Sequence, residues 1–95
     1  MNIDLTKLET ASETLKAIAH PIRISMVGLL DDNKELSVTE IYEALKIEQA
    51  VASHHLSILK NKDVLEVNRV GKNCFYKLKF PQLSQIITCI ETCHK

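Results

Sequence analysis

The stretch IEQAVASHHLSILKNKDVLEVNRVGKNCFYKL, residues 47–78, places a helical apolar pattern directly before two alternating ones. The residues expected on the inner side of the helix are Val51, His55, Leu56, Ile58 and Leu59. VLEVNRV and CFYKLKF then alternate apolar and polar residues, and residues 71–73 supply a turn between them. The stretch therefore predicts one helix followed by a β-hairpin with a basic tip.

Three further helices are expected before this stretch. An apolar stripe from Leu5 to Ile18 predicts the first, and Pro21, which needs no N–H in a first helical turn, starts the second. Residues 37–40, SVTE, have the form of a capping box, so a short third helix is expected from about Thr39 to Lys46. The third helix and the one in residues 47–78 are joined by a short turn, which is typical of a helix-turn-helix.

The end of the chain supplies a fifth helix, opened by Pro81. A three-helix core with a hairpin buries only part of the stripes on the first and last helices, which leaves surface for a partner. The predicted fold class is mainly α with a β-hairpin wing. Residues 1–95 are expected to form a single winged-helix domain, with the helix-turn-helix in 38–63 and the wing in 64–80.

The charges are unevenly distributed although the net charge is zero. Residues 1–45 carry four basic and eight acidic side chains, whereas residues 46–80 carry seven basic and three acidic ones. A local basic surface suits an anionic partner, while a solvated basic face without a partner is the alternative. Three cysteines form no disulfide framework and no signal peptide or membrane span is expected, so we expect a cytoplasmic protein.

The order of these segments resembles the ArsR/SmtB family of bacterial repressors. AIAHPIRISMVGLL, ELSVTEIYEAL and residues 47–78 follow one another without a break from about Leu15 to Leu78. Residues 19–23 match the start of the family's second helix, and residues 53–59 match its recognition helix. Asp63 departs from the family, in which glycine is common at this turn, and Glu48 departs from it by replacing a serine cap.

The resemblance implies a homodimeric transcriptional repressor that an effector releases from DNA. In the family the first and last helices, here 1–19 and 81–95, form the dimer interface. A two-fold dimer presents two recognition helices to successive major grooves of double-stranded DNA, so the operator should be an imperfect inverted repeat. A winged-helix module that binds protein without specific DNA binding is the alternative.

Nine residues are expected to contact DNA. A glutamine amide can pair with adenine, serine and histidine can bind base edges or phosphates, and basic residues of the wing can neutralise phosphates. These residues are Gln49, Ala50, Ser53, His54, Ser57, Lys60, Arg69, Lys72 and Asn73. Lys62 lies near the end of the same helix, and Phe75, Leu78 and Phe80 are expected in the core of the wing.

The two adjacent histidines have different expected roles. Neighbouring residues diverge by about 100° around a helix axis, so His54 and His55 cannot both bind one metal ion without distortion. His54 is expected to face the major groove. His55 is expected to turn inward or toward the third helix as a partly buried residue, with base contact as the alternative.

The effector is harder to predict than the fold. Ser37 and Thr39 occupy the places of a Cys-x-Cys pair that some family members use for metal, so that site is absent. Cys89 and Cys93 are four residues apart and could share Zn²⁺ or Cu(I), with His94 or a cysteine of the other subunit completing the site. Thiol oxidation and simple packing are the alternatives, and Cys74 is expected to be structural.

An enzyme is not expected. Histidine and serine side chains are available, but no acid is placed to orient a histidine and no glycine-rich phosphate cradle is present. The domain is also too small for a sizeable substrate pocket.

Overall fold

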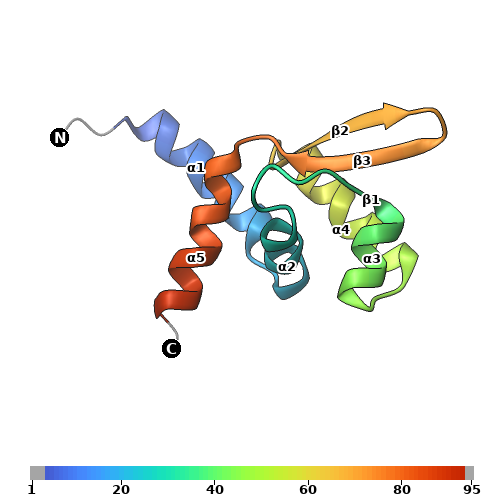
Figure 1. Cartoon of the computed structure of the whole chain (residues 1–95). Helices are drawn as coiled ribbons and strands as arrows, with labels where there is room; N and C mark the ends of the chain where they lie inside the picture. The colour runs from blue at the N-terminus through green and yellow to red at the C-terminus, as the bar shows by residue number, and fades with distance from the viewer. Residues whose placement is uncertain (1–3, 94–95) are drawn as a thin grey trace.

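The computed structural model describes residues 4–93 and arranges them as five α-helices and a small antiparallel sheet (Figure 1). The elements in chain order are α1 (Leu5–Ile18), α2 (Pro21–Leu29), β1 (Leu36–Ser37), α3 (Val38–Leu45), α4 (Gln49–Asn61), β2 (Leu65–Val70), β3 (Asn73–Leu78), the 3-10 helix η1 (Pro81–Leu83) and α5 (Ser84–Cys93). The predicted winged helix-turn-helix with five helices is confirmed.

Local signals in the sequence set the ends of α3. The Ser37 hydroxyl accepts the Glu40 N–H at 3.1 Å, and the Glu40 carboxylate accepts the Ser37 N–H at 3.0 Å, so the predicted capping box is present. Lys46 has a φ of 56°, and this left-handed conformation ends the helix. The helix therefore begins and ends one residue earlier than predicted.

The core lies where α2, α3, α4 and the sheet meet. A set of twelve apolar residues is buried there: Ala17, Ile18, Met26, Val27, Leu30, Ile41, Ala52, Leu56, Leu59, Val64, Leu65 and Leu78. Of these residues α1 contributes two, both in its last turn, and α5 contributes none. The first and last helices are therefore attached to the core but are not part of its centre.

The sheet has three strands in the order β1-β3-β2, although only the hairpin was predicted. The hairpin pairs Leu65 with Leu78 at its base and Val70 with Asn73 at its tip, so Asn73 begins β3 and does not belong to the turn. β1 has two residues and pairs with β3 near Tyr76. A strand this short has no alternating pattern that a sequence could reveal, because its pairing with β3 creates it.

The turn between α4 and β2 needs an unusual backbone conformation. Asp63 has a φ of 59°, in the left-handed region that glycine adopts most easily. Aspartate is among the residues that tolerate this region, and the Asp63 carboxylate also accepts a hydrogen bond from the Lys79 ammonium at 3.3 Å. The residue that departs from the family pattern is therefore compatible with the turn.

Two expectations about the end of the wing were wrong. Leu78 is buried, but Phe80 is 54% exposed and does not belong to the wing core. It lies beyond the last residue of β3, where the alternation of the strand no longer directs a side chain inward. Pro81 opens the 3-10 helix η1, and α5 begins only at Ser84.

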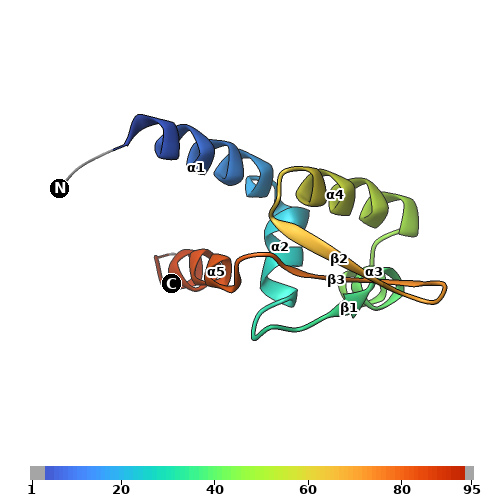
Figure 2. The same ribbon diagram turned by 90° about the horizontal axis from the view of Figure 1, so that it is seen from above.

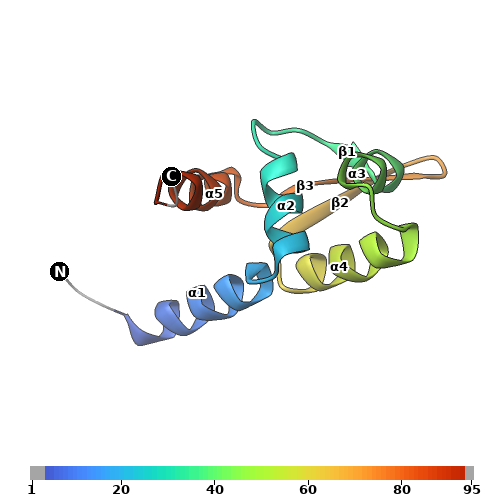
Figure 3. The same ribbon diagram turned by 90° about the horizontal axis from the view of Figure 1, so that it is seen from below.

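The arrangement separates two ends of the molecule. α1 and α5 lie at one end, whereas α3 and the tip of the hairpin lie at the other (Figure 2). α1 projects away from the body, and its buried residues, Ala17 and Ile18, lie in the last turn, beside α2 and α4 (Figure 3). Within residues 4–93 no helix is long and apolar enough to cross a membrane.

Candidate nucleic-acid interface

α4 has one buried and one exposed face. Its buried residues are Ala52, His55, Leu56 and Leu59. The five residues of this helix that were expected to contact DNA are all exposed: Gln49, Ala50, Ser53, His54 and Ser57. Because this exposed face is small and polar, the helix can approach a partner closely and bind it through hydrogen bonds.

The start of α4 is fixed by its connection to α3. The Ile47 N–H donates to the Tyr42 carbonyl at 3.1 Å and closes the turn between the two helices. Glu48 is the N-terminal cap, but its side chain makes no capping hydrogen bond. Its carboxylate is favourable to the positive end of the helix dipole, yet it would repel a nearby phosphate.

The tip of the wing lies beside the start of α3. Lys72 and Asn73 are exposed, and they line a shallow pocket together with Ser37, Val38 and Thr39. Gly71 has a φ of 63°, which permits the tight turn that presents both side chains. The sequence did not indicate Thr39 as a possible DNA contact, because only the folded structure brings the start of α3 beside the wing.

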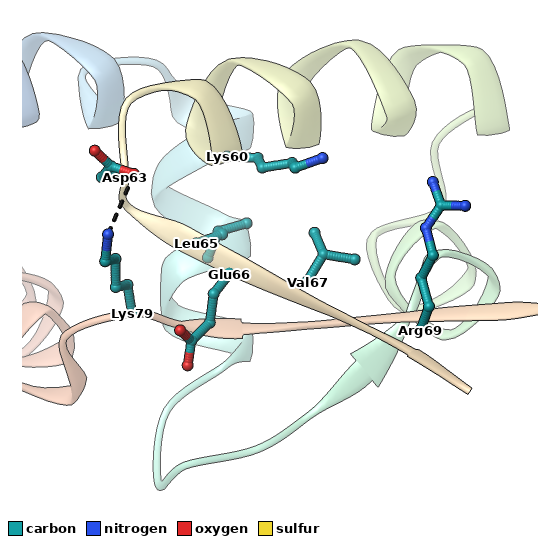
Figure 4. Close-up of a pocket in the computed structure, with 7 residues that line it drawn as sticks. All are labelled: Lys60, Asp63, Leu65, Glu66, Val67, Arg69 and Lys79. Carbon is teal, nitrogen blue, oxygen red and sulfur yellow. Dashed lines mark hydrogen bonds and ion pairs between the residues drawn. The ribbon is translucent and has the colours of Figure 1, made fainter.

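A groove runs between the second half of α4 and β2 (Figure 4). Lys60 from α4 and Arg69 from β2 extend into this groove, with Val67 between them. Glu66 points from the opposite side of β2, as alternation along a strand requires. The two cations therefore lie on the same side of β2 and give this part of the groove a positive surface.

Three other basic residues of this region form ion pairs. Their ion pairs are Lys62 with Glu13 at 3.7 Å, Lys77 with Glu66 at 3.3 Å and Lys79 with Asp63 at 3.3 Å. Lys60, Arg69 and Lys72 have no ion pair among residues 4–93. Lys46, which ends α3, is likewise unpaired within the described part of the chain, so the free positive charge of residues 46–80 lies in the groove, at the wing tip and at the turn before α4. Lys62, which ends α4, pairs with Glu13 of α1.

Three histidines gather where the start of α2 meets α4. The ring centroids of His20 and His55 are 4.4 Å apart, and those of His54 and His55 are 5.1 Å apart. His55 is 8% exposed, so its predicted inward orientation is confirmed. Burial lowers the pKa of His55, and positive charge on His20, His54 and Arg23 lowers it further.

A model of the family described as "Bacterial regulatory protein, arsR family" matches residues 20–67. The chain is 39% identical to the transcriptional repressor PagR of Bacillus anthracis over 90% of its own length and 85% of that protein's length. The chain belongs to the ArsR family. It is a transcriptional regulator and not an enzyme, as predicted.

Solved structures agree with this ArsR-family assignment. The crystal structure of PagR has a TM-score of 0.82 and 37% identity, and covers 92% of this chain and 99% of that one. HlyU from Vibrio cholerae N16961 also has a TM-score of 0.82 and is 26% identical to this chain. The match covers 93% of this chain and 95% of the HlyU chain. The repressor SmtB of Mycobacterium tuberculosis is 36% identical over 84% of this chain, which spans 58% of that protein.

The possible metal ligands of this ArsR-family chain lie apart from the groove. Cys89 and Cys93 are exposed on α5, whereas Cys74 is half-buried in β3. His94, the third candidate ligand, lies outside the described residues. Among residues 4–93 no group of three or more potential ligands is close enough to hold a metal ion. Two cysteines of one chain would need further ligands to complete a zinc or copper site.

Proposed function

We propose that this protein is a homodimeric transcriptional repressor that inserts α4 into the major groove of double-stranded DNA. The observation that supports this function is the exposed polar face of α4 beside three unpaired basic residues, Lys60, Arg69 and Lys72. Repression is favoured over activation because PagR and SmtB are both named repressors.

Each part of this surface has its own proposed role. Gln49, Ser53 and His54 bind base edges and supply sequence choice, while Ala50 and Ser57 allow close approach of the helix. The groove and the wing bind phosphates, which gives affinity and register but little sequence choice. Lys60, Arg69, Lys72 and Asn73 supply these contacts.

The dimer would form through α1 and α5. Six large apolar side chains are exposed among the described residues, and they are Leu5, Leu8, Leu15, Val70, Phe80 and Ile90. Four of these belong to α1 and α5, and Phe80 lies beside η1 at the same end. A groove between these helices is lined by Ala11, Leu15, Leu83 and Ile86. Burying this surface against a second copy stabilises a domain whose own core is small.

Such a dimer would bind an operator with two half-sites. A two-fold axis relates the two α4 helices, so each enters one of two successive major grooves about 34–36 Å apart. The operator is then an imperfect inverted repeat, and occupation of a promoter by the dimer blocks transcription. A cytoplasmic location fits both the DNA partner and the free cysteines.

The proposed effector acts on the DNA-free arrangement of the dimer. An effector releases DNA only if it binds the DNA-incompetent arrangement more tightly than the competent one. Cys89 and Cys93 are the candidate receptors on α5, either as ligands for Zn²⁺ or Cu(I) or as thiols that an oxidant modifies. Metal binding and thiol oxidation would each act at the proposed dimer interface and change the spacing of the two α4 helices.

The decisive experiment is a fluorescence-anisotropy titration of the reduced protein onto its own upstream promoter DNA, with a scrambled duplex as control. Selective, salt-dependent binding is expected. Repeating the titration with Zn²⁺, Cu(I) or a mild oxidant, and with Cys89→Ser and Cys93→Ser variants, tests the effector. Absence of selective binding would favour a module that binds protein instead of DNA.

A further inference from the structure

The histidine cluster connects the exposed face of α4 to the beginning of α2. His20 caps α2, because its Nδ1 accepts the Ile22 N–H at 3.1 Å. The His20 ring lies against His55, which in turn lies against the exposed His54. Figure 3 shows the start of α2 beside α4. His55 therefore lies at the contact between α4 and the start of α2, beside the apolar core.

The surroundings of His55 accept a neutral ring but not a charged one. Its Nδ1 is buried without a hydrogen-bond partner, as is the Nε of Arg23. The charged or titratable groups that act on the ring are His20, Arg23 and His54, and each carries positive charge when protonated. The carboxylates on α1, α3 and β2, the other elements packed against α4, are all exposed and do not act on it: Glu9, Glu13, Glu40, Glu43 and Glu66.

We propose that His55 is a positioning residue that holds α4 in its DNA-binding place only while its ring is neutral. A proton on His55 would add a buried positive charge beside Arg23 with no carboxylate to offset it. Moving α4 away from the start of α2 would bring the ring to water and relieve this cost. The inference rests on the proposed function, since α4 is the helix proposed to enter the major groove.

The expected pH dependence has an unusual sign. Protonating an exposed histidine near DNA adds a cation and strengthens binding. While α4 is packed against the start of α2, the pKa of His55 is lower than its usual value of 6.5. The packed arrangement of α4 is therefore most stable above pH 6.5 and loses stability as the pH falls below 6.5. At pH 5.5, one unit below the usual value, this effect can weaken binding by at most about tenfold per subunit, and so by at most about a hundredfold for a dimer that inserts two α4 helices.

The test measures promoter affinity by fluorescence anisotropy at pH 7.5 and 5.5 and constant ionic strength. Wild type should bind more weakly at pH 5.5, by up to about tenfold per subunit and about a hundredfold for the dimer, whereas His55→Asn, whose side chain does not titrate, should change less than about twofold. His54→Asn removes the exposed ring and should keep the acid-induced loss, whatever its affinity at pH 7.5. Equal or tighter wild-type binding at pH 5.5, or the same loss in His55→Asn, would overturn the proposal.

A second measurement needs neither DNA nor a variant. Hydrogen exchange of the wild-type backbone amides, corrected for intrinsic rates, should show several-fold lower protection of α4 relative to the β2–β3 hairpin at pH 5.5 than at pH 7.5. Unchanged relative protection would refute the role of His55 even if the protein binds DNA. If promoter binding is absent at both pH values while α4 loosens in acid, the proposed function fails and the positioning role stands.

Discussion

Removing the two cations of the α4–β2 groove should change the salt dependence of DNA binding by a predictable amount. Lys60 and Arg69 extend into the groove without carboxylate partners among residues 4–93, and Lys72 lies unpaired at the wing tip. If each neutralises one phosphate, a dimer makes about six such contacts, and the slope of log K against log salt is about −5.4. The double variant Lys60→Ala, Arg69→Ala keeps about two contacts and a slope of about −1.8.

These slopes give a large difference in a simple experiment. Between 50 and 200 mM salt, wild-type affinity for the promoter should fall about 2,000-fold, whereas that of the double variant should fall about 12-fold. The assay is fluorescence anisotropy at four or more salt concentrations, with promoter and scrambled duplexes. Binding to both duplexes should weaken by a similar factor at low salt, because phosphate contacts are independent of sequence.

Lys77→Ala is the matched control for this prediction. Lys77 is another lysine of the hairpin, but Glu66 pairs with it at 3.3 Å. Its removal should change the slope by less than about half a unit. A double variant with the wild-type slope would show that the groove does not hold the phosphate chain. The slope change of Lys77→Ala can also be compared with half of the slope change of the double variant, which is the average effect of one groove substitution. If the two are equal, net charge, and not the groove, determines the salt dependence.

Three other perturbations separate recognition, stability and assembly. Ser53→Ala with His54→Ala should weaken promoter binding by about 1–3 kcal/mol and leave binding to scrambled DNA and thermal unfolding nearly unchanged, since both side chains are exposed. Leu59→Ala should lower the free energy of unfolding by about 2–5 kcal/mol in urea titrations, because Leu59 is fully buried, and a loss below about 1 kcal/mol would contradict its place in the core. Leu15→Glu should give a folded monomer in sedimentation experiments, because Leu15 is 52% exposed on the proposed dimer face, and an unchanged sedimentation coefficient of the dimer would refute that assignment.

Local patterns in the sequence predict the five α-helices, the hairpin and the polar outer face of α4, but not β1 or η1. Helical spacing, Pro21, the capping box of residues 37–40 and the alternation on either side of Gly71 depend on interactions between residues close in the chain. The inward orientation of His55 also follows from its place on the apolar side of one helix. Such short-range rules hold before the chain folds, which is why the order of helices and the hairpin could be predicted.

Contacts between residues far apart in the chain arise only when the elements pack together. β1 exists because Leu36 pairs with Tyr76, and the contact between His20 and His55 exists because α2 packs on α4. Which lysines remain unpaired likewise depends on contacts across the fold, such as the ion pair of Lys62 with Glu13 on α1. These contacts join segments far apart in the chain, and no local pattern encodes them, because their geometry is fixed only when the helices pack around a common core.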